Sequence, residues 1–194
     1  RTVRLTTEER RMLERELEEA VRMRHSNLCT VVGACLQPGS EMLIVEHVPL
    51  GSLRDMLARG FSFSVEQRIR IAQGMAAGLA YLHSWSPPQP HGRLNSHKVL
   101  LDGSMNAKIT GWGMRSLRQF HRSDWLKVPV HCLYCAPEVL QGGADSPETD
   151  VHMWAMTAYE LFYPGQPFFI GHTFPEARQG IIDGTLRPHL YDPS

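Results

Sequence analysis

Apolar residues recur at helical spacing in the first part of the chain. The positions that share one face of a helix are Leu13, Leu17, Ala20 and Val21. Thr6 lies three residues before Glu9, which is the spacing of a capping box. The pattern therefore predicts an amphipathic helix over about residues 7 to 23.

Two β-rich apolar runs come next along the chain. NLCTVVGACL and EMLIVEHV are joined by QPGS, which is a proline-glycine turn signal. We expect them to form an antiparallel hairpin. The following LRDMLARG predicts a short helix that ends at Gly60.

A second capping-box pattern, Ser64 with Gln67, begins a longer helical pattern that runs to about His83. The positions expected to face a core are Ile69, Ala72, Met75, Ala76, Leu79 and Leu82. After it, KVLLD and AKIT flank GSMN and predict two short strands around a tight turn.

The last third of the chain alternates between irregular and helical patterns. Residues 111 to 135 show no sustained period, which indicates a functional or disordered loop. Ser146 before Pro147 is a good helix start, and the apolar DVHMWAMTAYELF after it predicts a buried helix. FPEARQGIID before Gly184 predicts one more helix. We divide the chain into a small unit, residues 1–48, and a mostly helical unit, residues 49–194.

Composition narrows the classes of function. The 194 residues are 42% hydrophobic, with 20 basic and 20 acidic side chains, so no overall positive field would attract nucleic acid or an anionic membrane. We expect no nucleic-acid partner and no direct membrane contact from this segment. Four cysteines without a long apolar run predict a reducing, cytoplasmic setting, within a larger or membrane-anchored protein as an alternative.

Cys132 and Cys135 form a C-x-x-C pattern beside His131. A zinc site would need further ligands at matching spacing, and Cys29 with Cys35 lies in the predicted hairpin instead. We therefore predict no metal site.

The order of several short motifs resembles the protein kinase superfamily, and within it the tyrosine-kinase-like branch. The motifs are RHSNL with VVGACL, LIVEHVPLGSLRDML, HGRLNSHKVLLDGSMNAKIT, YCAPEVL, TDVHMWAMTAYEL, GQPF and GTLRP. The resemblance implies an α+β, bilobal kinase-like fold in truncated form. It would comprise a partial N-lobe of helix C and the hairpin after it, and a mostly helical C-lobe up to helix G. By this alignment, the strands before helix C and the helices after helix G are missing.

The resemblance also implies that the catalytic motifs are degenerate. The aspartate of H-R-D-L-x-x-x-N falls on Arg93, its asparagine on Lys98, and the aspartate of D-F-G on Gly111. The proton acceptor and both metal ligands would then be absent, so no catalytic residue is intact. The alternative is a register shifted so that Asp102 serves as the base.

Other family positions that the alignment assigns have structural or regulatory roles. Glu16 falls on the helix C glutamate, His91 and Trp112 on the apolar stack between the lobes, Glu138 on the A-P-E glutamate, and Asp150 on the helix F aspartate that anchors the catalytic loop. Gly92 replaces an arginine that in many kinases holds a phosphate.

A nucleotide pocket, if retained, would use the hinge. Its residues would be Val45, Glu46, His47, Val48 and Leu100. Adenine recognition needs only backbone and apolar contacts, so ATP could bind without Mg²⁺, although no cofactor is certain. Arg93 and Lys98 would either meet phosphate or pair with carboxylates.

These features predict a non-catalytic kinase-like domain, a pseudokinase. It would act as a scaffold or allosteric regulator in intracellular signalling, and it would bind another protein through helix C and the activation segment. One alternative is an active ATP-dependent protein kinase with atypical catalytic residues. Another is a kinase-homology regulatory domain of a larger receptor or cyclase.

Overall fold

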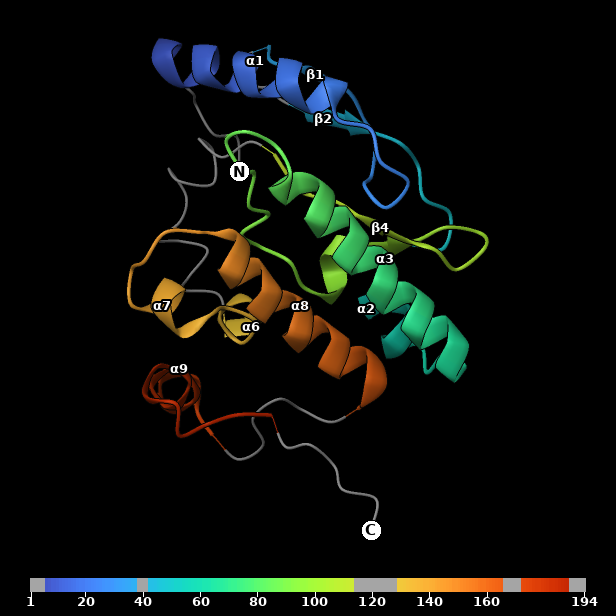
Figure 1. Cartoon of the computed structure of the whole chain (residues 1–194), viewed down its shortest axis with the longest axis vertical. Helices are drawn as coiled ribbons and strands as arrows, with labels where there is room; N and C mark the ends of the chain where they lie inside the picture. Colours follow the sequence, from blue (N-terminus) through green and yellow to red (C-terminus); the bar gives the residue numbers. More distant parts are fainter. Residues whose placement is uncertain (1–5, 38–41, 114–128, 166–171, 189–194) are drawn as a thin grey trace.

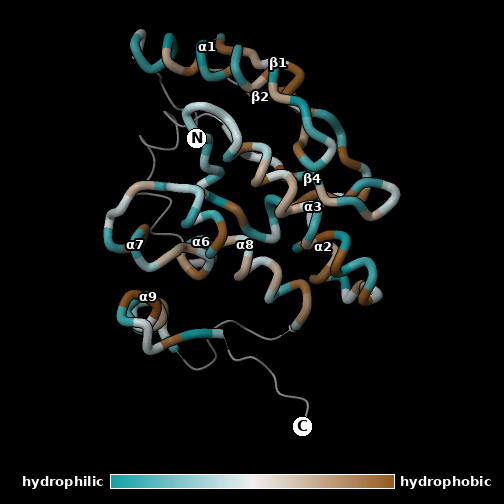
Figure 2. Tube along the Cα trace, viewed as in Figure 1, coloured by the Kyte–Doolittle hydropathy of each residue, from teal (hydrophilic) through white to brown (hydrophobic). Residues whose placement is uncertain are grey.

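The computed structural model describes residues 6–37, 42–113, 129–165 and 172–188 (Figure 1). The first element is α1, Thr7–Arg22, and the Thr6–Glu9 capping box begins it as predicted. Its buried residues are Leu13, Leu17 and Ala20. Hydrophilic and hydrophobic residues alternate along α1 (Figure 2), as expected for a helix that covers a core with one face.

The predicted hairpin is present beneath α1. Strands β1, Val31–Cys35, and β2, Met42–Val45, pair antiparallel, with a register irregularity between Val31 and Gly33. Most of the QPGS turn lies outside the described residues. α1 packs against β1, so α1 and the hairpin form one small layer at the top of the molecule (Figure 1).

Two helices follow the hairpin. α2, Leu53–Ala58, begins with a capping box of Ser52 and Asp55, and Gly60 follows it with a positive φ of 74°. α3, Val65–His83, begins with the predicted Ser64–Gln67 capping box.

The expected core face of α3 needs a correction. Ile69 is 45% exposed and Ala76 is exposed, whereas Ile71 and Gly78 are buried. The buried face is rotated because α3 packs against a strand through its glycines, which a count of apolar side chains overlooks.

The second sheet is the predicted pair of short strands. A 3-10 helix η1, Ser96–Lys98, leads into β3, Val99–Leu101, which pairs antiparallel with β4, Ala107–Ile109. Isolated bridges join Leu28 to Ile109 and Ser52 to Leu100. These bridges connect the β3–β4 ribbon to the segments before β1 and after β2.

The remaining helices are α6, Pro129–Cys132, α7, Pro137–Leu140, α8, Pro147–Phe162, and α9, Phe174–Asp183. The expectation of no regular structure over residues 111–135 was wrong at its end, because α6 forms there. Residues 114–128 of that stretch lie outside the described part. α8 packs against α3 and is mostly buried, as predicted, although Val151 is 58% exposed.

Two small sheets beside a mostly helical part make the α+β class that the sequence predicted. The core joins α1, β1, α3, β3, β4 and α8. Among the described residues, no helix is both long and apolar enough to cross a membrane.

Gly78 provides a test of the α3 packing. A Cβ built there would lie 2.9 Å from the Asn27 carbonyl oxygen and 3.0 Å from Cδ1 of Ile109. We expect Gly78→Ala to lower the free energy of unfolding by about 1–2 kcal/mol, because the clash outweighs the better helix propensity of alanine. Gly103, where a Cβ would meet nothing within 4 Å, is the control. Urea unfolding of both variants measures the difference, and an equal or more stable Gly78→Ala protein would contradict the packing.

Candidate functional site

The loop of residues 91–98 is anchored from beneath by Asp150 on α8. The carboxylate of Asp150 accepts the backbone N–H groups of His91 and Gly92, both at 2.7 Å, and lies 2.8 Å from Nε2 of His83. Asp150 is fully buried. The loop is thus held by a buried carboxylate far away in sequence, and His83 is a partner that sequence reasoning missed.

The backbone conformation and the close neighbours at position 92 favour glycine there. The φ of Gly92 is 70°, and a Cβ there would lie 2.5 Å from Oδ2 of Asp145. The left-handed backbone and the close approach of Asp145 both favour glycine. A side chain at this position would have to displace Asp145.

His91 and Arg93 follow directly in the loop. His91 is fully buried, with Nε2 lying 3.1 Å from the carbonyl oxygen of Thr110 and Nδ1 accepting the Arg93 N–H at 3.2 Å. The loop is therefore tied to the end of β4, just before Gly111. The Arg93 side chain is half-buried.

Lys98 and Gly111 lie against one another. A Cβ built on Gly111 would be 3.2 Å from Cδ and 3.4 Å from Nζ of Lys98. Burial, and after it the nearby Arg93 charge, lower the pKa of Lys98. The structure thus brings together the three positions that the motif alignment assigned to lost catalytic groups.

His131 on α6 belongs to the same surroundings. Its pKa is lowered first by burial and then by the positive charges of Lys98, His97 and Arg93. His131 therefore lies within electrostatic range of these three basic side chains. Within the residues the structure describes, no group of three or more histidine, cysteine or carboxylate side chains could hold a metal ion.

Asp102, the alternative base, lies in the β3–β4 turn. Its Oδ1 accepts the N–H groups of Ser104 and Asn106, both at 2.9 Å, and its Oδ2 accepts the Asn106 amide at 3.1 Å. Burial raises the pKa of Asp102, but these hydrogen bonds outweigh it and lower the pKa overall. A carboxylate with three donors and a lowered pKa is a poor proton acceptor.

The hinge residues connect β2 to the second sheet. The Glu46 N–H donates to the Thr30 carbonyl at 2.9 Å, and the Glu46 side chain accepts from the Thr30 N–H at 2.7 Å and from Lys108 at 3.0 Å. Burial raises the pKa of Glu46, yet these hydrogen bonds lower it overall. The glutamate side chain therefore braces the hinge.

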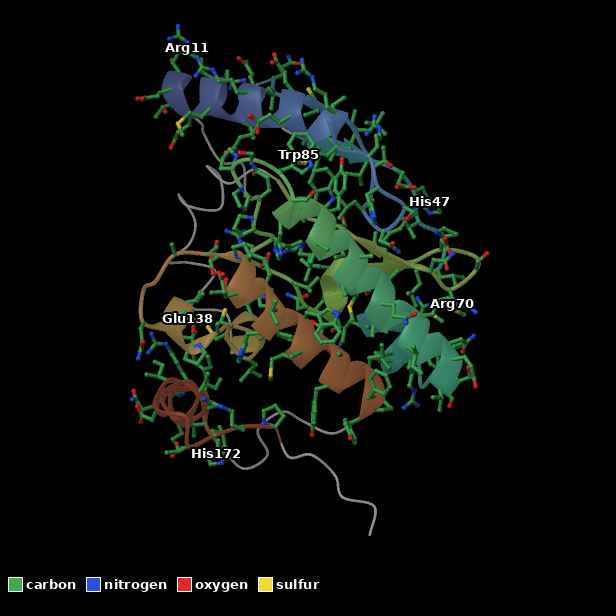
Figure 3. The ribbon with its side chains drawn as sticks, in the orientation of Figure 1. Arg11, His47, Arg70, Trp85, Glu138 and His172 are labelled. Carbon is green, nitrogen blue, oxygen red and sulfur yellow. The ribbon has the colours of Figure 1, made fainter. Side chains whose placement is uncertain are left out.

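The backbone of the hinge leaves polar groups for a ligand. The Glu46 carbonyl oxygen accepts a hydrogen bond from the Cys29 thiol, at 3.6 Å. In the described part of the chain, no hydrogen bond uses the N–H of Val48, which is buried. His47 between them is exposed (Figure 3), and Val45 is 37% exposed. Leu100 is half-buried on β3.

Trp112, next to Gly111, connects the site to the segment before β1. It is 3% exposed, and its indole N–H donates to the Cys29 carbonyl at 3.2 Å. Ala20 is also buried, and it lies 3.7 Å from where a Cβ on Gly113 would be. Glu16 is half-buried on α1, four residues before Ala20.

Tyr134 and Glu160 form a second buried network. The Tyr134 hydroxyl donates to Glu160 at 2.6 Å and lies 3.3 Å from the Ser96 hydroxyl, while Arg54 contacts Glu160 at 2.9 Å. Burial, and then Glu160, raise the pKa of Tyr134 strongly. No sequence signal pointed to Glu160 or Arg54. The Tyr134 side chain is 5% exposed, so its hydroxyl is poorly placed for phosphorylation.

Glu138 lies on α7, and its side chain is exposed (Figure 3). Its backbone carbonyl accepts the Gly143 N–H at 2.7 Å. Arg178 on α9 donates to the carbonyl of Leu140, so α7 and α9 are held together.

Known proteins similar to this chain are named as kinases. LRR receptor-like serine/threonine-protein kinase FEI 2 of Arabidopsis thaliana is 34% identical over 154 residues, which cover 78% of this chain and 26% of that protein. Dual specificity protein kinase shkC of Dictyostelium discoideum is 28% identical over 86% of this chain and 33% of that protein. Dual specificity protein kinase splA of the same organism is 30% identical over 80% of this chain and 7% of that protein. The chain thus spans about a third or less of the length of these relatives.

The family described as protein tyrosine and serine/threonine kinase matches residues 2–189. The partial bilobal kinase fold expected from the motifs is confirmed by this match together with the small sheets and mostly helical content. Because the match covers nearly the whole chain, the protein belongs to the protein tyrosine and serine/threonine kinase family.

Proposed function

We propose that this chain is a pseudokinase domain of the tyrosine-kinase-like branch that regulates another protein in intracellular signalling without transferring phosphate. The observation that carries the proposal is the contact between Lys98 and Gly111, with Arg93 as their charged neighbour. By the motif alignment, Arg93 takes the position of the family's base, Lys98 that of its metal-binding asparagine, and Gly111 that of its metal-binding aspartate.

Phosphoryl transfer requires the opposite arrangement of charge. Magnesium ions bridge the phosphate oxygens and are held by an aspartate and an asparagine, while a second aspartate accepts the proton of the acceptor hydroxyl. Mg²⁺ takes oxygen ligands and is bound through carboxylates, which Lys98 and Gly111 cannot supply. Lys98 would also repel the metal. The geometry thus favours loss of catalysis over an altered mechanism.

The scaffold that positions the loop is nevertheless complete. Asp150 holds the backbone of His91 and Gly92, and the His91 ring contacts the end of β4. A domain that keeps this loop in place without its chemistry can act through its surface and through the equilibrium between its conformations. We therefore assign regulation or scaffolding as its role.

The partner surface that we propose is the outer side of α1 together with the activation segment. A groove of about 450 Å³ lies between α1 and β1. Its apolar lining includes Leu17, Val21 and Leu36, and its charged lining residues are Glu14, Glu18 and Arg22. An apolar groove lined by two glutamates and one arginine would suit a helix or strand with apolar side chains and a small excess of basic ones.

An active kinase with atypical residues remains the second candidate, because the similar proteins are named as kinases. The two functions differ in their need for metal. A thermal-shift titration of the intact protein with ATP, in EDTA and then with Mg²⁺ or Mn²⁺, separates them.

We expect ATP alone, through the hinge, to raise the melting temperature by roughly 3–6 °C at about tenfold above its dissociation constant. Added Mg²⁺ or Mn²⁺ should raise it no further, and metal without nucleotide is the control. Stabilisation by ATP that requires the metal would overturn the pseudokinase proposal and favour the second candidate.

A further inference from the structure

The side chain of Lys98 lies against a position that has no side chain of its own. The Lys98 N–H donates to the Asn95 carbonyl at 2.8 Å, and the Lys98 carbonyl accepts the Thr110 N–H at 2.9 Å, so its backbone is held from both sides. A Cβ built on Gly111 would lie 3.2 Å from Cδ and 3.4 Å from Nζ of Lys98. The amine of Lys98 is therefore placed next to Gly111.

Gly111 leaves this amine within reach of a small molecule. Gly111 is exposed, with a φ of 80°, and Lys98 is itself half-buried. Since glycine adds no side chain there, nothing at position 111 itself blocks access to Nζ. The amine is thus partly removed from water and yet adjacent to an exposed position.

Lys98 and Lys108 form a matched pair of lysines. Both are half-buried, and they lie on the same small ribbon, Lys98 at the end of η1 just before β3 and Lys108 on β4. Nζ of Lys108 lies 3.0 Å from a carboxylate oxygen of Glu46. Within the described part of the chain, no carboxylate forms a salt bridge with Lys98, and no hydrogen bond uses its Nζ. The two amines therefore differ in their countercharge.

A half-buried amine without a carboxylate partner favours its neutral form. Burial disfavours the ammonium ion, and a nearby like charge does so too. Burial, followed by the Arg93 charge, lowers the pKa of Lys98. The neutral amine has a free lone pair and is a nucleophile, whereas the ammonium ion is not. At neutral pH, Lys98 thus has a larger share of the nucleophilic form than a lysine in water.

We propose that Lys98 is a modification site, at which its amine is acylated by a small acyl thioester. The lone pair of Nζ attacks the carbonyl carbon of the thioester, so a C–N amide bond forms and the C–S bond breaks. The departing sulfur takes the proton that Nζ loses, and the products are an amide and a thiol. The thioester is the only co-reactant that the step needs.

Acylation would change the charge of the 91–98 loop by one unit. A lysine ammonium becomes a neutral amide, which also removes the cost of a half-buried charge without a carboxylate partner. The change falls on the position that the motif alignment assigns to the family's asparagine. The inference goes beyond the proposed function and does not depend on it, because an amine can be acylated whether or not the domain transfers phosphate.

Competitive acetylation of the intact protein tests the inference. The probe is S-acetyl-N-acetylcysteamine, a small acetyl thioester, at neutral pH in EDTA. Mass spectrometry follows the rates at Lys98 and Lys108, after hydroxylamine has removed acetyl groups from cysteines. Lowering a pKa by about one unit raises the neutral share of an amine about tenfold, and part of this gain is lost because a weaker base is a weaker nucleophile. We expect Lys98 to react at least about threefold faster than Lys108.

Variants at position 111 separate the effect of charge from that of access. Gly111→Asp adds a carboxylate beside Nζ of Lys98, whereas Gly111→Asn adds a neutral group of the same size. We expect acetylation of Lys98 to be about fivefold or more slower in Gly111→Asp than in Gly111→Asn, because a carboxylate partner stabilises the ammonium ion. Circular dichroism verifies that each variant is folded, and Lys98→Arg verifies the assignment of the acetylated peptide.

Two results would each overturn the inference. They are acetylation of Lys98 that is no faster than that of Lys108, and equal rates at Lys98 in Gly111→Asp and Gly111→Asn. The first comparison uses the unaltered protein, so it holds even where a variant does not fold. Neither result bears on the thermal-shift titration with ATP and metal, so the pseudokinase proposal would stand or fall separately.

Discussion

The intact protein is expected to transfer no measurable phosphate from ATP and Mg²⁺ to protein substrates. Loss of one general base costs about 10² to 10⁴ in rate. Here Arg93 replaces the base, and Lys98 and Gly111 replace both metal ligands, with the Lys98 side chain packed over Gly111. Their combined loss should place any residual rate at the level of a reaction without protein. Transfer of radiolabelled phosphate to casein and to myelin basic protein measures it.

Asp102 is the residue that could contradict this expectation. If Mg²⁺-dependent transfer is found, Asp102→Asn should abolish it under the shifted register, whereas Asp183→Asn on α9 should not. The three hydrogen bonds to the Asp102 carboxylate in the β3–β4 turn argue against that role. Phosphate transfer that survives Asp102→Asn would indicate a base that neither the original nor the shifted motif register contains. It would equally end the pseudokinase proposal.

Local chemistry explains why the helices and strands could be predicted. The capping boxes of Thr6 and Ser64 form as their spacing implies, since the donor and acceptor are only three residues apart. The Ser52–Asp55 box at α2 follows the same rule, although the prediction did not use it. The face of α3 was misjudged because close packing at Gly78 involves the backbone of Asn27, which lies in a distant segment.

In the candidate site too, some residues could be predicted from the sequence and their long-range partners could not. Motif order placed Arg93, Lys98 and Gly111 in equivalent family positions, and the structure brings Lys98 and Gly111 into contact. The partners His83, Asp145 and Glu160 were not predicted. Each lies more than twenty residues from the group it contacts, and neither periodicity nor capping carries information over such separations. Such pairs depend on how the helices pack.

Replacing Asp150 by alanine should cause the largest loss of stability, about 3–5 kcal/mol in the free energy of unfolding. The fully buried carboxylate accepts two backbone N–H groups at 2.7 Å and contacts His83 at 2.8 Å. Alanine would leave these donors without an acceptor in a site closed to water, and an unpaired buried polar group costs its full desolvation penalty. Urea unfolding measures the loss.

Two further variants make the result specific to the carboxylate. Asp150→Asn keeps one acceptor oxygen and should lose about half as much, whereas Asp183→Ala, an exposed aspartate that contacts Gln179, should change stability by less than about 0.5 kcal/mol. Amide hydrogen exchange at His91 and Gly92 should accelerate in Asp150→Ala, because their acceptor is gone. If Asp150→Ala loses no more stability than Asp183→Ala, other contacts hold the loop, and the loop conformation on which the regulatory role depends is not set by α8.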